Sequence, residues 1–426
     1  MIRRFSLYGF LKNQRYHEPF FVLALREQGL SFLDIGLLFG FRELCVNLLE
    51  IPSGAIADVY GRRRCMLLSL TAYVAAFVVF GLAPGLGLLY AAMALYAVGE
   101  AFRSGTHKAM IFTWLNDQGR GADKAEVYGY TRSWSKRGSA VAALIAAAIA
   151  LVVGDFTTVF FCTAIPYALN VANLASYPRS LDGGASSKRP GALLRTVWQG
   201  LRAAWTIRAL RRLLGESMAF EGGLKLTRTY LQPLIELWAV GLPLVAMIAA
   251  GGEGIDVAFT QTVVAAGLVY FVLGLVESGA SRRAGRLAKR RGSSAAAVRS
   301  IFAVNLLCAL ALLAAVLAGL PAVAVVVFVI QLGALQNLFR PVQLARYDVH
   351  TPAQLGATVL SIESQARAVF VAVGAPLLGR AVDVLSARGG GVTALWPVAA
   401  LGCAVAVILG SVARVREGDD APPPAS

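Results

Sequence analysis

Long apolar runs recur along the whole chain, and they constrain its fold more than any other feature. Each has the length of roughly 20 residues with which a helix crosses ~30 Å of hydrocarbon. They lie near residues 6–26, 33–56, 65–84, 87–112, 127–152, 156–177, 216–240, 257–279, 296–319, 321–344, 354–379 and 392–413. In lipid, only helices and closed barrels satisfy the backbone, and these runs lack the two-residue alternation of barrel strands. The sequence therefore predicts an all-α integral membrane protein with twelve transmembrane helices.

Charged residues are scarce, and they gather between the apolar runs. Only 15% of the 426 residues are charged, whereas a soluble domain has about a quarter. Basic residues fill alternate loops, such as 62–64, 179–212 and 282–291, while the opposite loops hold little beyond Arg26 and Arg388. The positive-inside rule then places both termini in the cytoplasm. The net charge of +16 is thus explained by topology, and we expect no nucleic-acid partner.

A polar stretch in the middle of the chain separates two groups of six runs. It predicts an N-terminal six-helix bundle at 1–177, a cytoplasmic linker at 178–212, a C-terminal bundle at 213–413 and a disordered cytoplasmic tail at 414–426. The second part of the linker is predicted to be an amphipathic helix on the membrane surface, with Trp198 and Trp205 on one side.

Short similarities between the two halves suggest a duplication. Residues 16–21 (YHEPFF) in the first run parallel residues 230–235 (YLQPLI) in the seventh, and the tripeptide SGA recurs at 53–55 and 278–280. These positions correspond in the two halves, as expected for the internal repeats of transporters. We therefore expect two pseudo-symmetric bundles.

The strongest local motif joins the second and third runs. Residues 54–64 read GAIADVYGRRR. Gly54 and Gly61 lack side chains, which permits close helix contact and a tight turn. Asp58 can accept from Arg62 or face the N-terminus of another helix, in a contact that forms in one conformation and breaks in another.

This motif resembles the G-x-x-x-D-x-x-G-R-[RK]-[RK] loop of the major facilitator superfamily, and residues 50–53 (EIPS) extend the similarity toward bacterial efflux members. The resemblance implies a multi-pass protein of the bacterial inner membrane with a cytoplasmic latch between its two bundles. The latch residues would be Gly54, Asp58, Gly61, Arg62 and Arg63. The alternative is an ordinary basic loop. Span five (GSAVAA at 138–143) lacks the proline of the G-x-x-x-G-P run found in many antiporters.

Ionisable residues within membrane spans are costly and therefore mark candidate functional sites. The candidates for proton coupling are Glu18, His17, Glu100 and Arg103. A buried carboxylate beside an arginine can load and release a proton, and histidine titrates near neutrality. In the superfamily, an arginine at the position of Arg103 often takes part in proton coupling, so the resemblance implies that role here.

Other polar residues in the spans are candidates for a substrate cavity: Lys12, Asn13, Arg15, Tyr16, Lys136, Glu221, Lys225, Gln336, Asn337, Glu363 and Arg367. Two pairs among them, 221 with 225 and 363 with 367, have i,i+4 spacing and are equally compatible with structural ion pairs. Lys108, Arg132 and Arg137 lie near the basic face, where snorkelling explains them. The excess of positive charge in the N-terminal half favours an anionic or zwitterionic solute.

The sequence has no ATP-binding P-loop, nucleophile elbow or metal-binding cluster, so we expect neither an enzyme, a cofactor nor a metal. The leading hypothesis is a monomeric secondary transporter that exports a small organic solute by alternating access, coupled to protons. One alternative is proton-coupled uptake of an organic anion or zwitterion. Another is a transport-inactive sensor that has kept the fold.

Overall fold

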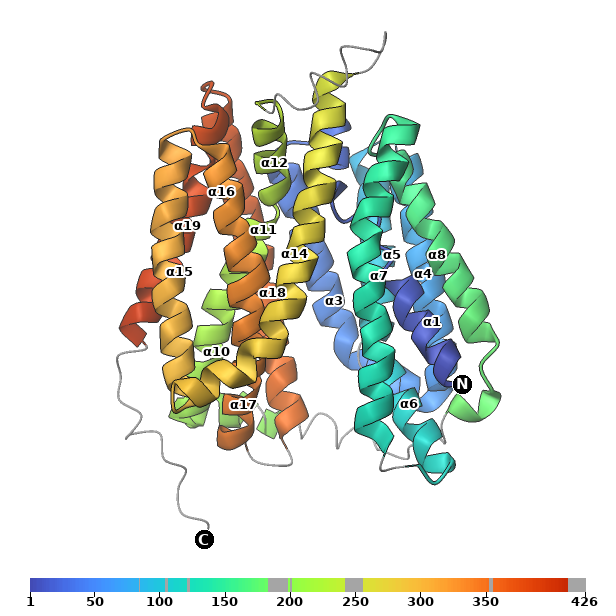
Figure 1. Cartoon of the computed structure of the whole chain (residues 1–426). Coiled ribbons are helices and arrows are strands. Elements are labelled where there is room, and N and C mark those ends of the chain that lie inside the picture. Colours follow the sequence, from blue (N-terminus) through green and yellow to red (C-terminus); the bar gives the residue numbers. More distant parts are fainter. Residues whose placement is uncertain are drawn as a thin grey trace. The chain divides into compact units, whose positions relative to one another are not determined.

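A computed structural model describes residues 1–83, 85–103, 106–120, 123–182, 198–199, 201–241, 256–351 and 355–412. Within these residues, the regular elements are all helices and no strand occurs (Figure 1). The predicted all-α fold class is therefore confirmed. The tail at 414–426 and most of the linker lie outside the described residues.

The chain forms two compact units. Unit 1 comprises Met1–Ser187 and Ala239–Phe271, and unit 2 comprises Lys188–Trp238 and Val272–Ser426. Unit 1 therefore includes a segment of the second half of the sequence, residues 239–271. The predicted domain boundaries at 177, 212 and 413 stay predictions.

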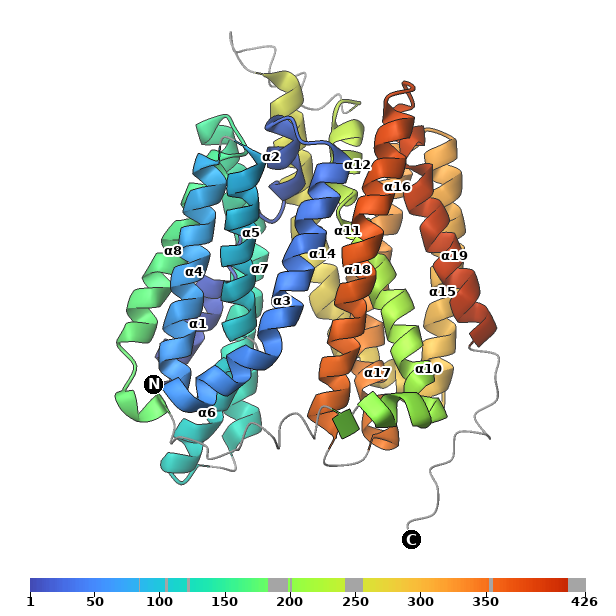
Figure 2. The same cartoon turned by 180° about the vertical axis from the view of Figure 1, so that it is seen from behind.

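Unit 1 is a bundle in which α1 packs between α7 and α8 (Figure 1), while α4 packs against α5 and α8 (Figure 2). Its helices are α1 (Ile2–Lys12), α2 (Phe21–Glu27), α3 (Phe32–Tyr60), α4 (Arg62–Leu82), α5 (Leu86–Arg103), α6 (Thr106–Asp117), α7 (Lys124–Val153), α8 (Thr158–Ala175) and the short η2 (Arg179–Asp182).

Unit 2 packs α15 against α19 and joins α10 to α17 at one end (Figure 2). Its helices are α10 (Arg208–Ser217), η3 (Met218–Gly222), α11 (Gly223–Arg228), α12 (Leu231–Ala239), α15 (Ser294–Leu317), α16 (Pro321–Phe328), η4 (Val329–Leu335), α17 (Gln336–His350), α18 (Gly356–Ser386), η5 (Gly391–Leu395) and α19 (Trp396–Val412). Of these, η3 and η4 are wide π-helical turns.

The helix α14 (Val257–Arg290) contributes to both units. In its first half, Gly267 packs closely against Ala147 of α7. In its second half, Leu273 and Val276 pack against Gly333 of η4. The small glycines allow the helices to approach at both places.

Nine helices of the described part are long and apolar enough to cross a membrane: Arg62–Leu82, Leu86–Asp117, Glu126–Val153, Thr158–Ala175, Val257–Arg290, Ser294–Leu317, Pro321–His350, Thr358–Ser386 and Gly391–Gly410. The other three crossings are α3 and the segments 2–27 and 208–239. They are less apolar or interrupted: α3 carries Asp34, Arg42, Glu43 and Glu50, and the other two are built from several short helices. Together they give the twelve-helix fold that the sequence predicted.

The first crossing differs from its prediction as one apolar run over 6–26. It consists of α1 and α2, with residues 13–20 between them outside any helix. Pro19 explains part of the break, because proline lacks an N–H and disfavours helix in the residue before it. Side chains of α8 stabilise the broken segment: Tyr167 donates to the Lys12 carbonyl (3.0 Å), and Thr163 accepts from the His17 N–H (3.1 Å).

The corresponding crossing of unit 2 breaks at the matching position. Residues 229–230 form a turn between α11 and α12, directly before Gln232 and Pro233. In this break the Tyr230 N–H donates to the Thr227 carbonyl (2.9 Å). The parallel between YHEPFF and YLQPLI thus coincides with an interruption in both units.

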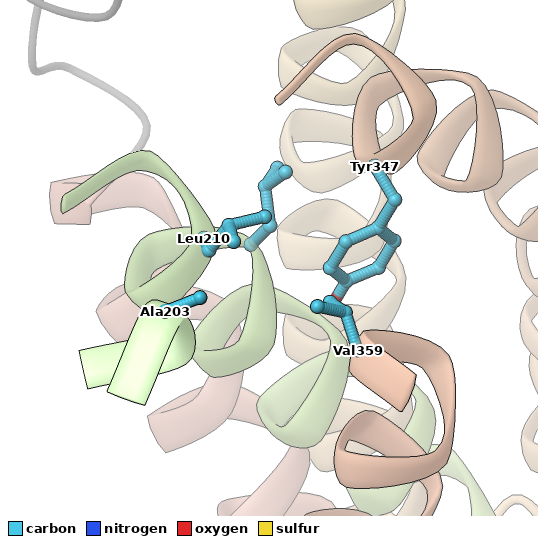
Figure 3. Close-up of a cluster of buried hydrophobic side chains, with 5 residues drawn as sticks. Ala203, Leu210, Tyr347 and Val359 are labelled. Atoms are coloured by element: carbon cyan, nitrogen blue, oxygen red, sulfur yellow. The ribbon is translucent and has the colours of Figure 1, made fainter. Parts of the chain in front are cut away.

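An apolar cluster fixes α10 to α17 and α18 (Figure 3). Ala203 and Leu210 lie on one side of it, and Tyr347 and Val359 lie on the other. Leu210 and Val359 are fully buried. Trp198 and Trp205 are about 70% exposed, and their position on the membrane surface stays a prediction.

Candidate functional site

A pocket of about 330 Å³ lies in unit 1 between α1, α5, α6 and α7. Its volume is at the lower end of the range for small-molecule sites. It is lined by Phe5, Tyr8, Gly9, Lys12, Asn13, Arg103, His107, Lys108, Tyr128, Thr131, Arg132, Ser135, Lys136 and Ser139.

Two glycines bring α1 and α7 close together beside the pocket. A Cβ at Gly9 would lie 2.5 Å from Ser135 Oγ, and one at Gly138 would lie 2.6 Å from the Phe10 carbonyl oxygen. Because neither glycine has a side chain, the two backbones approach closely. The Gln14 amide then donates to the Gly138 carbonyl (3.2 Å) and ties the end of α1 to α7.

Aromatic rings form one wall of the pocket. Tyr8 stacks on His107 with 3.8 Å between ring centroids, and Phe5 meets His107 edge to face at 5.6 Å. The His107 Nε2 atom is buried and has no hydrogen-bond partner among the described residues. A ligand or water in the pocket would satisfy it, because buried polar atoms are normally hydrogen-bonded.

The remaining charged lining is entirely cationic. Five lysine and arginine side chains contribute: Lys12, Arg103, Lys108, Arg132 and Lys136. None of them forms an ion pair with a carboxylate of the described residues, and no aspartate or glutamate lines the pocket. The Arg103 Nε donates to the Tyr73 hydroxyl over a long 3.4 Å, and Lys108 lies over the rings of Phe112 and Tyr128.

This charge excess gives the pocket its chemical character. Positive side chains along one cavity raise the local concentration of anions. Hydroxyls and an amide in the wall, from Thr131, Ser135, Ser139 and Asn13, supply further polar groups. The pocket can therefore bind a small anion with an aromatic or planar part.

Four of the predicted residues, Lys12, Asn13, Arg103 and Lys136, line this pocket. Sequence reasoning assigned Lys108 and Arg132 to interfacial snorkelling and did not consider Tyr8 as a site residue. A signal existed in the sequence, since residues 128, 132 and 136 and residues 131, 135 and 139 form adjacent i,i+4 stripes on α7.

The polar run of the first crossing lies in the break between α1 and α2. His17 is buried among aromatic rings, with Phe77 at 4.7 Å and Phe160 at 6.1 Å. Arg15 pairs with Glu18 at 3.8 Å, and both are partly exposed. Tyr16 lines a second, apolar groove beside α8, while Glu100 lies on α5 outside the lining of the cationic pocket.

The arginine motif after α3 is organised by contacts within unit 1. Gly61 has a φ of 98°, and a Cβ there would lie 2.7 Å from the Asp182 carboxylate, which accepts from the Arg64 N–H. Arg62 donates to the Thr113 hydroxyl (3.0 Å), and Arg63 donates to the Ala175 carbonyl (2.6 Å). Nothing lies within 4 Å of a Cβ at Gly54 in the described part. The side chain of Asp58 lies outside the described residues.

Unit 2 contains a cluster of four buried or half-buried charges from three helices. Arg340 of α17 contacts Glu363 (2.5 Å) and Glu221 (3.4 Å). Arg367 of α18 contacts the same two carboxylates, with 3.7 Å to Glu363. Glu221 and Glu363 are 5% and 1% exposed. The structure thus brings these predicted residues together with Arg340, which the site prediction had left out.

The remaining predicted residues of unit 2 lie nearby along the chain. Lys225 is exposed on α11, one turn after Glu221. Asn337 donates to the Leu332 and Gly333 carbonyls (3.1 and 3.0 Å) and thereby supports η4, whose wide turn leaves carbonyls in need of donors. Gln336 is half-buried at the start of α17.

The family model of the Major Facilitator Superfamily matches residues 16–375. The chain belongs to the major facilitator superfamily. It is therefore a membrane transporter by family, which agrees with its helical fold and apolar spans. The resemblance inferred from the motif at 54–64 is confirmed at the level of the superfamily, while its likeness to efflux members stays a prediction.

Solved superfamily transporters share its fold. The nucleoside transporter NupG has 13% identity and a TM-score of 0.74, and the match covers 97% of this chain and 99% of that one. A bacterial homologue of the human lysosomal transporter Spinster has 16% identity and a TM-score of 0.70, covering 99% and 98%. A mutant of the peptide transporter POT has 15% identity and a TM-score of 0.62, covering 97% and 94%. No curated protein matches the chain.

Proposed function

We propose that this superfamily member is a secondary active transporter of a small organic anion that works by alternating access. The cationic pocket of unit 1 carries this proposal. Five positive side chains line it without a carboxylate among them, so a bound anion would offset their mutual repulsion. The aromatic wall of Tyr8 and His107 favours an anion with a ring or another flat apolar part.

Proton coupling, export and a place in the bacterial inner membrane are the finer parts of the proposal. Glu18 and His17 in the broken first crossing, with Glu100 and Arg103 on α5, are its candidate coupling residues. Export rests on the efflux-type motif at 50–64. Uptake of the anion together with a proton is the competing direction, and a transport-inactive sensor is the competing class.

The first test is a ligand screen by thermal stabilisation of the purified protein, since a bound ligand raises apparent stability. Benzoate, succinate and phenyl phosphate are compared with the neutral benzamide. We expect one or more anions to stabilise the protein and benzamide to have no effect. Stabilisation by neutral or cationic solutes alone would contradict the proposal.

Adjacent residues of α7 offer a matched pair of variants. Lys136 lines the pocket, whereas the neighbouring Arg137 does not. We expect Lys136→Gln and Lys12→Gln to weaken binding of the anion about 10- to 100-fold, as for loss of a hydrogen bond to a charged group. Arg137→Gln should bind like the unmodified protein. Equal losses in Lys136→Gln and Arg137→Gln would show that general surface charge, not the pocket, attracts the anion.

Flux measurements in proteoliposomes distinguish export from uptake, and a transporter from a transport-inactive sensor. A pH gradient imposed in either orientation, with the stabilising anion on one side, shows whether the anion moves with the proton or against it. Absence of flux in both orientations and absence of anion exchange would support the sensor.

The latch is proposed separately, for Asp58, Arg62 and Arg63 together with the two glycines of the motif. Asp58→Asn is expected to slow transport while leaving the protein inserted in the membrane. Transport at the original rate in this variant would remove the latch role from Asp58.

A further inference from the structure

We propose, on the basis of the anion transport inferred above, that the cationic pocket of unit 1 binds a dianion whose two negative groups lie at opposite ends of a flat ring. Lys12 and Lys136 bind one group, and Lys108 binds the other. The ring lies between them, beside the stacked side chains of Tyr8 and His107. The number of charges on the solute and their spacing are thereby assigned in addition to their sign.

The two helices that carry most of the lining, α1 and α7, lie side by side (Figure 1). A Cβ at Gly9 would lie 3.2 Å from the Thr131 carbonyl oxygen and 2.5 Å from Ser135 Oγ. Further along both helices, the Gln14 amide donates to the Gly138 carbonyl (3.2 Å). Because the contacts advance together along both helices, α1 and α7 run in the same direction, and each position of one can be matched to a position of the other.

Lys12 and Lys136 form one end of the pocket. Each lies two residues before a member of the bonded pair Gln14 and Gly138, so the two lysines are level with each other on neighbouring helices. The Tyr167 hydroxyl donates to the Lys12 carbonyl (3.0 Å) and fixes this end of α1. Neither lysine forms an ion pair with a carboxylate of the described residues. Two ammonium groups at one level can bind the same carboxylate or phosphate group.

Lys108 lies at the other end of the pocket. Its Nζ is 5.4 Å from the centre of the Tyr128 ring and 5.3 Å from that of the Phe112 ring. Tyr128 comes about two helical turns before Lys136 on α7, which corresponds to about 12 Å along the helix axis. Within the described part of the chain, Lys108 has no carboxylate partner either. The two ends of the pocket therefore present separate positive charges.

Aromatic side chains form the wall in the middle of the pocket. Tyr8, matched in the same way, is level with Arg132, which lies about one turn from Tyr128 and about one turn from Lys136. The Tyr8 ring stacks on His107 with 3.8 Å between centroids. A ligand ring at this level can stack on the aromatic wall, and the guanidinium group of Arg132 can lie over it.

The distribution of charge favours two negative groups over one. Arg103, the fifth cation, donates from its Nε to the hydroxyl of Tyr73, which does not line the pocket (3.4 Å). The other four cations are spread along the pocket, and no carboxylate of the described residues lines it. A solute with one negative group offsets the charge at one end only, whereas a dianion offsets both. The volume of about 330 Å³ has room for a benzene ring with two opposite carboxylates.

The first test compares the affinities of three ligands for the unmodified, purified protein by isothermal titration calorimetry. Terephthalate has carboxylates at opposite ends of a benzene ring, its monomethyl ester keeps the shape with one charge, and phthalate has both carboxylates on neighbouring carbons. We expect terephthalate to bind about 10- to 100-fold more tightly than either of the other two. Binding of the monoester or of phthalate as tight as that of terephthalate would overturn the proposal.

Lys108 and Lys124 provide a matched pair of variants. The Nζ of Lys124 lies over the same Phe112 ring at 5.7 Å, but Lys124 does not line the pocket. In Lys108→Gln, we expect most of the difference in affinity between terephthalate and its monoester to disappear, whereas Lys124→Gln should retain it. Lys108→Arg keeps the charge and should also retain the difference. An undiminished difference in Lys108→Gln, or an equal loss in Lys124→Gln, would contradict the position assigned to the second negative group.

The outcome for the dianion is separable from that for the proposed function. If benzoate stabilises the protein but terephthalate binds no more tightly than its monoester, the anion transporter stands and the dianion site does not. If terephthalate binds as expected but proteoliposomes show neither flux nor exchange of it, the dianion site stands and transport does not. If no anion binds, both proposals are wrong.

Discussion

In this superfamily member, the cationic pocket of unit 1 and the buried carboxylates of unit 2 differ in whether their charged side chains form ion pairs. In unit 1, five cations line one pocket and none of them is paired with a carboxylate of the described residues. In unit 2, Glu216, Glu221 and Glu363 are each held by arginines from other positions. Both arrangements lie in segments that a lipid bilayer penalises. The cations of the pocket in unit 1 thus lack a carboxylate partner among the described residues, whereas each of these buried carboxylates of unit 2 has arginine partners.

An ionisable residue in a membrane span can therefore have either of two roles, in stabilising the fold or in binding a ligand. A paired ion in a low-dielectric interior contributes to the fold, and removing its partner is costly. A cation without a carboxylate partner gains no such stabilisation from the fold, and we propose that a bound anion supplies it in unit 1. The same residue types therefore have different consequences in the two units.

The largest effect should come from breaking a complete pair in unit 2. Arg346→Gln leaves Glu216 buried with one of its two guanidinium partners missing, and we expect a loss of about 3–5 kcal/mol in unfolding free energy. Lys136→Gln in the pocket of unit 1 should change it by less than about 0.5 kcal/mol. Thermal unfolding in detergent compares the two. Similar losses of unfolding free energy in both variants would show that the two units do not differ in this respect.

A smaller effect is expected at the interrupted crossings. Thr163 is fully buried and accepts from the His17 N–H, so Thr163→Val leaves a buried donor without a partner. We expect a loss of about 1–3 kcal/mol. In unit 2, the hydroxyl of Thr227 donates to the Gly223 and Leu224 carbonyls of its own helix and to no other group of the described residues.

Thr227→Val is therefore the control, with an expected loss under about 1 kcal/mol. Hydrogen exchange at the two breaks gives an independent measure. Greater exchange at residues 16–18 in Thr163→Val would sharpen the contrast. A larger loss in Thr227→Val than in Thr163→Val would contradict the expected difference between the two threonines.

The smallest effect on stability should follow from making the pocket of unit 1 resemble unit 2. Ser139 lines the pocket one turn after Lys136, so Ser139→Asp supplies the missing carboxylate. We expect a gain of about 0.5 kcal/mol together with weaker anion binding. Ser133→Asp lies on the same helix outside the pocket lining and controls for the added charge. If Ser139→Asp binds the anion as tightly as the unmodified protein, the charge of the pocket does not determine anion binding.

Many residues of the site could be identified from the sequence, but which of them lie together in space could not. Lys12, Asn13, Arg103 and Lys136 were all recognised as polar residues in spans, and they do line one pocket. Their neighbours Tyr8 and Lys108 were missed, because an aromatic residue in a span and a lysine near its end have ordinary explanations. In unit 2, the i,i+4 spacing suggested that Glu221 and Glu363 had separate local partners. The structure keeps the local contact between Arg367 and Glu363 (3.7 Å) and in addition joins both carboxylates to Arg340, more than a hundred residues after Glu221.

The sequence by itself determined the membrane fold and the superfamily, whereas the two breaks in the crossings appeared only in the structure. Hydrophobic length, charge placement and local motifs such as GAIADVYGRRR are properties of neighbouring residues, so they can be read along the chain. Only the tertiary structure decided which charges are paired. Pairing depends on contacts between helices that are distant in sequence, such as Arg340 with Glu363. For that reason, the sequence alone could not distinguish the unpaired cations of the pocket in unit 1 from the arginine-bound carboxylates of unit 2.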